Sequence, residues 1–427
     1  MRTLFISHLF PHPPNTGANQ RIFHLLRAVA KVSEVTLVCE LPPETSPPDI
    51  SPLREFVSEV HWIPRETTAL YKDLQRPFLA RAILGKLRYF HFREPVLLQW
   101  ERSVEGQRLV AELCKRSYDL VWAERLIGFR LLPPDLRSRI IVDLDDLEHR
   151  KLAHRLRAAP VLRMLPLEFL EFWRLRTLER SMARSVHRVL VCSSFDKHLL
   201  GGSHVDLVPN GVDLPLLAPS SPPRPEVPTF TFVGYMGYPP NIDAVSFFAR
   251  RVFPRVLDKL PQAKFNIVGR DPDVAVQRLH NGRNIVVTGT VPTIEPYLRA
   301  STACIVPIRF GAGTRIKILE ALAFRTPVVT TRVGAEGLDI QANRHALVAD
   351  SPRMFAEACV RLHEDGLLAQ RLSDAGSDLV RLSHSWDVIE RGVLPLVWGA
   401  LDERGAHETR EQSHVVPVSG GARGDAR

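Results

Sequence analysis

The segment RFGAGTRIKILEALAFRTPVVTT, residues 309–331, contains the residues best suited to bind a phosphate. A strand is predicted to end at Pro307–Ile308, a glycine-rich loop follows, and a helix begins near Thr314. The first amides of a helix have no intrahelical partner and carry the positive end of the helix dipole, so they attract anions. Gly311 and Gly313 allow an anion to approach the backbone closely. We therefore expect these glycines and Thr314 to bind a phosphate group.

Three charged residues of the following helix extend this prediction. Arg315 and Lys317 flank the helix start and could form charge-assisted hydrogen bonds to a diphosphate. Because a cation is otherwise unfavourable at a helix N-terminus, a phosphate role is expected for at least one, with Lys317 ahead of Arg315. Glu320 lies about one turn further along and could accept two hydrogen bonds from a ribose diol. The alternative is a surface glycine turn with a solvated charged face.

The spacing of the glycines excludes two common nucleotide sites. The loop fits neither the Walker A template nor the GxGxxG template. Neither a P-loop NTPase nor a dinucleotide oxidoreductase is therefore predicted.

A second group of reactive side chains lies in IIVDLDDLEHRK, residues 140–151, where a predicted strand ends. It contains Asp143, Asp145, Asp146 and Glu148. Carboxylates this close together suit Mg²⁺ or Mn²⁺. They could equally be a helix N-cap with solvated acids.

The elements that position these residues alternate between strands and helices along the whole chain. This pattern predicts an α/β protein with parallel sheets and helices on both faces. Strands are expected at 3–9, 34–39, 119–123, 139–144, 187–193, 229–233, 264–269, 285–288, 303–307 and 327–331. Helices are expected at 19–31, 241–260, 293–300 and 316–324.

A Pro- and Ser-rich segment divides this alternation into two parts. We predict a first domain at 1–213, a linker at 214–228 and a second domain at 229–384. The polar, Gly-rich residues 405–427 are predicted to be a disordered tail. Ligands of open α/β sheets bind at the carboxyl ends of the strands, so the site is expected in a cleft between the two domains.

Composition limits the class of protein further. The chain has 427 residues, 45% of them hydrophobic and 24% charged, with a formal net charge of +9. These values are typical of a soluble protein of two or three domains, and the charge suits phosphates, nucleic acid or an anionic membrane face. Five scattered cysteines indicate buried thiols in a reducing compartment. No apolar run approaches the roughly 20 residues of a membrane span, and we predict a cytoplasmic protein.

Several segments together resemble the retaining glycosyltransferases of family 4, which have the GT-B fold, and most closely the branch associated with bacterial exopolysaccharide assembly. The resemblance covers roughly residues 1–400 and is densest in the second domain. It implies two Rossmann-like domains facing each other across a cleft, with the acceptor on the first and a nucleotide-sugar on the second. It also implies a C-terminal helix, 385–404, that crosses back to the first domain. The segments that carry it are PNGVD, FVGYMGYPPNIDAVSFF, KFNIVGRDP, VTGTVPTIEPYLRAS and RFGAGTRIKILEALAFRTPVV.

The resemblance also implies roles for single residues. Glu320 matches the second glutamate of the family's EX7E motif, which binds the donor ribose. The first glutamate of that motif is replaced by Ala312, so its role must pass to backbone amides of residues 310–314 or to another side chain. Gly17, in the loop PHPPNTGANQR, matches a glycine whose backbone approaches the donor diphosphate from the opposite side; a proline-stiffened surface turn is the alternative.

In relatives, a His or Asp that follows the strand corresponding to 139–144 lies near the reacting sugar. Asp145 or Asp146 is therefore the candidate for orienting the acceptor hydroxyl. The resemblance implies a metal-independent enzyme, so no metal and no cofactor are expected. Lys317 and the loop amides would stabilise the departing diphosphate, and front-face transfer is favoured over double displacement, for which no paired carboxylates are obvious.

Residues 150–188 contain ten Lys or Arg among aromatic and aliphatic residues. Such a stretch could lie on an anionic membrane, or be a helix with a solvated basic face. No nucleic-acid-binding motif is evident, so nucleic acid is not an expected partner.

The predicted function is therefore the transfer of a hexose from a nucleotide-diphosphate sugar to a saccharide or lipid-linked acceptor. A nucleotide-sugar epimerase of the same fold and a non-catalytic protein that binds membrane surfaces are the alternatives.

Overall fold

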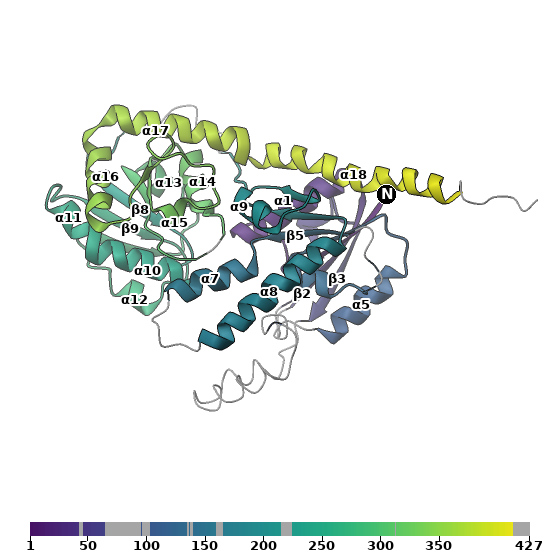
Figure 1. Cartoon of the computed structure of the whole chain (residues 1–427). Helices are drawn as coiled ribbons and strands as arrows, with labels where there is room; N and C mark the ends of the chain where they lie inside the picture. The colour runs from purple at the N-terminus through teal and green to yellow at the C-terminus, as the bar shows by residue number, and fades with distance from the viewer. Residues whose placement is uncertain are drawn as a thin grey trace, which may run out of the picture.

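The structure is a computed structural model that describes residues 1–41, 46–64, 95, 103–134, 136, 140–158, 165–214, 224–311 and 313–412. It consists of two α/β domains, each built on an all-parallel sheet, with α17 lying over the second domain and the long helix α18 over the first (Figure 1). The predicted fold class is confirmed. Most of the predicted linker, residues 215–223, lies outside the described residues, as does Ala312.

The first domain contains a seven-stranded sheet in the order β3-β2-β1-β4-β5-β6-β7. Its central strands are almost fully buried because helices cover both faces, as expected of parallel sheets. Sequence analysis missed β3, which pairs with β2 at the edge of the sheet. The strands are β1 (Arg2–Ser7), β2 (Glu34–Leu41), β3 (Glu59–Pro64), β4 (Leu120–Glu124), β5 (Ile140–Asp145), β6 (Arg188–Val191) and β7 (Val205–Leu207).

Helix α1 (Gly17–Ala30) shows why the helices of this domain form where they do. The Thr16 hydroxyl caps it by accepting a hydrogen bond from the Asn19 amide at 3.2 Å. Ile22, Leu25 and Val29 recur at helical spacing and are buried against the sheet. The other helices are α5 (Val104–Cys114), α6 (Arg125–Arg130), α7 (Glu148–Ala158), α8 (Leu165–Ser185), α9 (Ser194–Leu200) and the short 3₁₀ helix η1 (Ser51–Leu53).

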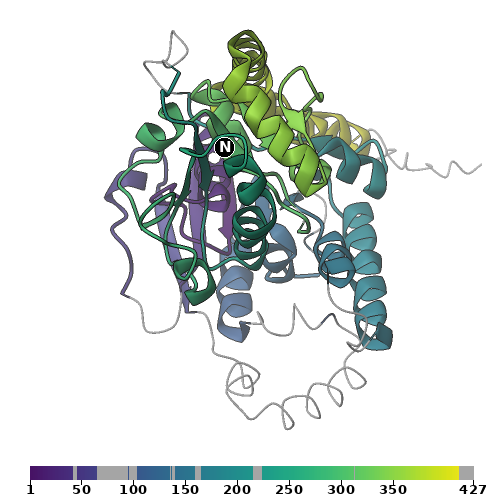
Figure 2. The same cartoon turned by 90° about the vertical axis from the view of Figure 1, so that its left-hand side faces the viewer.

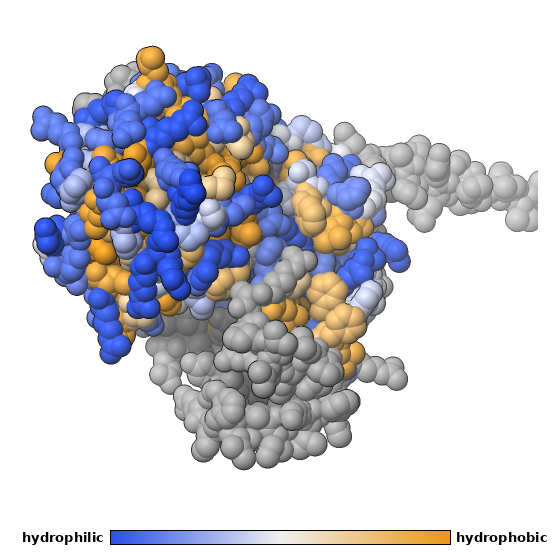
Figure 3. Space-filling model, turned by 60° about the vertical axis from the view of Figure 1, so that its left-hand side comes forward, coloured by the Kyte–Doolittle hydropathy of each residue, from blue (hydrophilic) through white to orange (hydrophobic). Residues whose placement is uncertain are grey.

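The second domain contains a six-stranded parallel sheet in the order β10-β9-β8-β11-β12-β13. It has a hydrophobic core of its own, formed by both faces of this sheet and the helices around it. Figure 3 shows hydrophilic side chains over much of its outer face, with smaller apolar areas between them. The strands are β8 (Thr229–Val233), β9 (Lys264–Val268), β10 (Ile285–Gly289), β11 (Ala303–Val306), β12 (Val328–Thr330) and β13 (Leu347–Val348).

The helix predicted at 241–260 is present, but it is not a uniform α-helix and it ends at Leu257. The segment forms α10 (Pro239–Phe247), a π-helical turn η2 (Phe248–Val252) and α11 (Phe253–Leu257). Pro254 lacks an amide hydrogen and its ring clashes with the preceding turn, which accounts for the interruption. The remaining helices are α12 (Val274–Gln277), α13 (Glu295–Arg299), α14 (Ile316–Ala323), α15 (Arg332–Ala335), α16 (Pro352–Glu364), α17 (Gly366–Leu379) and the π-helical η3 (Val380–His384).

Helix α18 (Trp386–Gln412) leaves the second domain and packs on α1 of the first (Figures 1 and 2). It continues to Gln412 and so includes residues 405–412, which the sequence placed in the tail. Glu390 of α18 accepts hydrogen bonds from His24 at 3.0 Å and Lys31 at 2.6 Å, and also binds Arg27. The crossing helix expected from the resemblance is therefore present.

Candidate active site

A cleft of about 610 Å³ lies between the two domains, at the carboxyl ends of the strands of both sheets. The first domain contributes Asn15, Thr16, Gly17 and Asp146 to its walls. The second domain contributes Gly313 to Lys317 and Glu320, together with residues that follow β8, β9 and β10. Most of the predicted donor-site residues therefore line one cavity.

Both described glycines of the loop have a positive φ. Gly311 has φ +113° and Gly313 has φ +93°, in the region that favours glycine. Helix α14 begins at Ile316, and its N-cap residue, Arg315, makes no capping hydrogen bond through its side chain. Gly311 lines the smaller pocket described below, while Gly313 and Thr314 line both.

Lys317 crosses the cleft wall from α14 to the start of α10. Its Nζ donates to Asn241 Oδ1 at 2.8 Å and lies 3.9 Å from the centre of the Phe232 ring. Burial lowers the pKa of Lys317 to about 7. An ammonium held in this way can be discharged near neutral pH and recharged by an arriving anion.

Glu320 lies one turn beyond Lys317 and also lines the cleft. Burial raises the pKa of its carboxyl, and the nearby Lys317 opposes that shift. A half-buried acid in this position can accept hydrogen bonds from hydroxyl groups.

Arg315 folds back onto the glycine loop. Its guanidinium donates to the carbonyl oxygens of Gly311, at 2.6 Å, and Gly313. The Arg315 side chain therefore stabilises the glycine loop, whereas the Lys317 side chain extends along the cleft wall to Asn241.

Gly17 opens α1 directly opposite α14. A β-carbon at this position would meet the Cδ1 atom of Ile316, so the two domains approach each other here as closely as a glycine permits. This places the N-terminus of α1 beside the N-terminus of α14.

The structure separates the two aspartates that the sequence could not distinguish. Asp145 is buried, with φ +57°, and binds Asn210 at 2.8 Å and Arg125 at 3.2 Å. Asp146 instead lines the cleft. Arginines Arg21 and Arg125 lower the pKa of Asp145 against the effect of burial, whereas burial and the charge of Asp145 raise the pKa of Asp146.

A buried ion network lies beneath this edge of the first sheet. Arg21 forms two hydrogen bonds with Asp143, at 2.8 and 2.6 Å, and a third with Asn210 Oδ1 at 2.9 Å. Asn210 belongs to the PNGVD segment, so the network ties this connection to α1 and β5. Its partners lie up to 189 residues apart, and sequence analysis did not identify Arg21.

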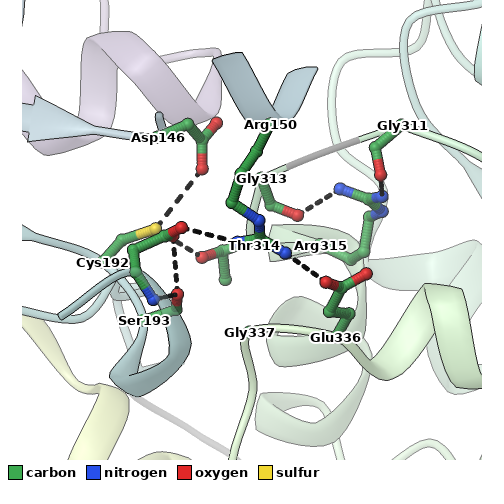
Figure 4. A pocket seen from close by; sticks show the side chains of 11 residues that line it. Asp146, Arg150, Cys192, Ser193, Gly311, Gly313, Thr314, Arg315, Glu336 and Gly337 are labelled. Carbon is green, nitrogen blue, oxygen red and sulfur yellow. Dashed lines mark hydrogen bonds and ion pairs between the residues drawn. The ribbon is translucent and has the colours of Figure 1, made fainter. Parts of the chain in front are cut away.

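A second, much smaller pocket adjoins the cleft where α7 meets the second domain (Figure 4). Arg150 of α7 bonds Asp196 at 2.6 Å and also binds Glu336 of the second domain. His154 lies 3.6 Å from the same Glu336. The Thr314 hydroxyl donates to Cys192 Sγ at 3.2 Å, so five side chains join the domains beside Asp146. Sequence analysis identified neither Arg150 nor Glu336.

One group of described residues has the spacing of a metal site. Donor atoms of Asp145, Asp146 and Cys192 lie within 4.8 Å of one another. The group suits a metal poorly, since Asp145 is already bound by Arg125 and Asn210. Burial also raises the pKa of the Cys192 thiol, which opposes formation of the thiolate that metals bind.

Sequence analysis gave no role to several residues of the cleft, because no motif distinguishes them from their neighbours. Asn241 lies within the quoted segment FVGYMGYPPNIDAVSFF, and Arg270 within KFNIVGRDP, but neither was assigned a role. Arg270 lies over the ring of Tyr235 at 5.2 Å, at the end of the cleft formed by the loops after β8 and β9.

Residues 227–365 match the family described as glycosyl transferases group 1. One curated relative, an uncharacterized 44.6 kDa protein in the cps region of Klebsiella pneumoniae, is 24% identical over 134 residues. The match covers 30% of this chain and 34% of the relative, so it spans about a third of that protein's length.

Solved structures match over almost the whole chain. Sucrose-phosphate synthase from Thermosynechococcus elongatus has a TM-score of 0.63 at 16% identity, covering 97% of this chain and 100% of its own. HepE from Anabaena, in complex with UDP and glucose, has a TM-score of 0.58 at 13% identity, covering 93% and 99%. TarM from S. aureus has a TM-score of 0.61 at 10% identity, covering 93% and 99%. The chain therefore has the two-domain GT-B fold, and residues 227–365 of its second domain resemble the glycosyl transferases group 1 family.

Proposed function

We propose that the protein is a retaining glycosyltransferase that moves a hexose from a nucleotide-diphosphate sugar to a saccharide or lipid-linked acceptor. The observation that carries the proposal is the cleft in which Lys317, Glu320 and the glycine loop lie across from Gly17 and Asp146. The group 1 domain and the HepE complexes, one of them with UDP-glucose, support a nucleotide-sugar donor. The cps-region relative fits a role in assembling a cell-surface polysaccharide or exopolysaccharide.

The second domain supplies leaving-group stabilisation. The Lys317 ammonium and the amides of residues 311–314 bind the diphosphate, whose negative charge grows as the glycosidic bond breaks. The Glu320 carboxylate accepts hydrogen bonds from the donor ribose. Gly17 brings the N-terminus of α1 to the opposite side of the same group.

The first domain supplies the acceptor side. Arg21 and Arg125 favour the charged form of Asp145, whereas burial and the charge of Asp145 raise the pKa of Asp146, which lines the cleft. Asp146 orients the acceptor hydroxyl. In a front-face transfer, an oxygen of the departing diphosphate accepts the proton of that hydroxyl. The reaction needs no metal or other cofactor.

Replacing Lys317 or Glu320 with alanine tests the donor site. Each variant is expected to lower turnover of a UDP- or GDP-sugar by orders of magnitude, while thermal unfolding stays cooperative. Lys259→Ala, an exposed lysine of the same domain, is the control and should retain full activity. Full activity in both site variants would contradict the assignment.

The two alternative functions give different results in the same assays. An epimerase would convert a UDP-sugar without added acceptor, and a binding protein without catalytic activity would show no affinity for nucleotide-diphosphates in calorimetry. Comparing UDP with GDP also identifies the preferred base.

We also propose a peripheral membrane contact through α8. Phe169 and Trp173 are 60% and 44% exposed, and the Arg176 guanidinium lies 5.0 Å over the Trp173 ring. Two of the three glutamates of α8, Glu171 and Glu179, are buried, so the outer charge is mainly basic. Aromatic and basic side chains on one exposed face suit an anionic lipid surface. Within the described chain, no helix is long and apolar enough to cross a bilayer.

Sedimentation with phosphatidylglycerol vesicles tests this contact. The double variant Phe169→Ala/Trp173→Ala should remain in the supernatant while the wild-type protein sediments. Leu367→Ala removes an apolar side chain that is 85% exposed on α17 and should sediment like wild type. Equal sedimentation of the double variant would exclude α8 as the contact.

A further inference from the structure

We propose that Asn241 is a positioning residue for donor binding, which holds the Lys317 ammonium at the point in the cleft where the diphosphate binds. The inference rests on the proposed function, because it assigns to Asn241 the orientation of a residue of that donor site. Neither the glycosyl transferases group 1 match nor the sequence motifs assign a role to Asn241.

The first argument is that both ends of the Asn241 amide are occupied. Its Oδ1 accepts from Lys317 Nζ at 2.8 Å, and its Nδ2 donates to the backbone oxygen of Tyr235, also at 2.8 Å. The side chain is buried at the start of α10. Because Nδ2 is bound to a carbonyl oxygen, the amide cannot flip, and an acceptor atom always faces the lysine.

The second argument is that two further residues of the cleft wall, Phe232 and Gly234, lie close to the Lys317 ammonium. The Phe232 ring centre lies 3.9 Å from Nζ, which favours the charged form through a cation–π contact. Gly234 lies on the other side, where an added β-carbon would be 2.7 Å from Nζ and 2.9 Å from Asn241 Nδ2. A β-carbon at this position would therefore displace the Lys317 ammonium or the Asn241 amide from the arrangement seen here.

The third argument concerns the charges around Lys317. Burial lowers its pKa most, Arg315 lowers it further, and Cys304 and Glu320 partly oppose the shift. Asn241 and Phe232, which contact Nζ directly, carry no net charge. The amide therefore orients the ammonium without neutralising it, and an ammonium has three N–H donors, so two are left for a ligand.

This arrangement makes donor binding depend on pH. In the free protein Lys317 is charged below about pH 7 and neutral above it. A bound diphosphate favours the charged form, so above that pH binding must take up a proton. Affinity is then constant below pH 7 and falls as the pH rises.

A double-mutant cycle tests the role of Asn241. Affinity for UDP-glucose and GDP-mannose, whose diphosphate diesters keep their charge between pH 6 and 9, is measured by calorimetry for wild type, Asn241→Ala, Lys317→Ala and the double variant. Each single substitution should weaken binding at least about tenfold, and the double variant should bind within about twofold of Lys317→Ala. Losses that multiply in the double variant would show that Asn241 acts independently of Lys317 and would overturn the proposal.

Asn241→Asp provides a readout that a merely structural role would not change. A carboxylate beside Nζ keeps Lys317 charged, so the fall in affinity between pH 7 and 9 should disappear, and binding should be weaker throughout because the carboxylate competes with the diphosphate. An unchanged pH profile would contradict the proposal.

The outcome remains interpretable if the proposed function fails. If wild type binds neither sugar nucleotide at any pH, the proposed donor site is wrong. An NMR titration of lysine labelled with ¹³C at Cε then still tests the pairing, since Asn241→Asp must raise the pKa of Lys317. No change in that pKa would overturn the pairing itself.

Discussion

The Asp146 carboxylate lies against Gly313 across the boundary between the two domains, such that a β-carbon on Gly313 would stand 2.5 Å from Asp146 Oδ2. The acid of the first domain thus reaches the loop at which the second domain is proposed to bind diphosphate. The closeness of Asp146 Oδ2 to Gly313 makes the two domains meet at this point of the cleft wall.

Substituting Gly313 tests that contact. Gly313→Ala should lower turnover at least about tenfold, since the methyl group displaces Asp146, and should cost about 1 to 2 kcal/mol in unfolding free energy because φ is +93°. Gly201→Ala is the matched control: it also has positive φ, at +67°, but its added β-carbon meets nothing within 4 Å. Equal activity of the two variants would show that the contact has no role in turnover.

Asparagine substitutions should separate the two aspartates. Asp146→Asn is expected to lower turnover about a hundredfold or more with little change in stability, because an amide oxygen accepts a hydrogen bond from the acceptor hydroxyl less strongly than a carboxylate does. Asp145→Asn should instead destabilise the fold by about 2 kcal/mol, because a buried carboxylate partner of Arg125 is removed. Turnover assays and urea unfolding of both variants measure the difference, and the reverse pattern would exchange the proposed roles.

The stabilisation that Glu390 of α18 gives through its contacts with α1 should depend on pH. The cations around Glu390 lower its pKa to about 2 against the effect of burial, so the carboxylate stabilises the fold above its unfolded pKa of about 4.3 and loses that effect as the pH falls from about 5 to 2. Glu390→Gln should cost about 2 kcal/mol at pH 7, and less as the pH falls toward 3. Urea unfolding of wild type and Glu390→Gln at pH 7, 5 and 3.5 measures the difference in their unfolding free energies. A difference that stays the same at all three pH values would show that the charge of Glu390 does not cause the pH dependence.

Removing divalent metals should leave the activity unchanged. The nearest donor group, Asp145, Asp146 and Cys192, combines a carboxylate already bound by Arg125 with a thiol whose pKa is raised. Turnover after EDTA treatment, with and without added Mg²⁺ or Mn²⁺, measures this. Loss of activity with EDTA and its recovery with metal would make this cluster a metal site.

Local sequence patterns were sufficient to predict the architecture. Apolar residues at helical spacing in α1 and continuous apolar runs in β1 and β8 identify a parallel α/β protein, since each pattern reflects burial over a few residues. The glycine loop before α14 was recognisable for the same reason, because a positive φ and a helix start are local properties. The edge strand β3 and the π-helical turn at η2 were missed, since pairing at an edge and packing around Pro254 override the local pattern.

The site depended on contacts between residues far apart in the chain. Sequence alone left Asp145 and Asp146 equivalent; the tertiary structure separates them, because Arg125 and Asn210 surround one while the other borders the cleft. Likewise Lys317 was recognisable as a cation near the loop, but its lowered pKa and its bond to Asn241 arise only when α10, α14 and β8 come together. The sequence by itself determined which residues carry charge, and the fold decided which of those charges are buried, paired or available to a ligand.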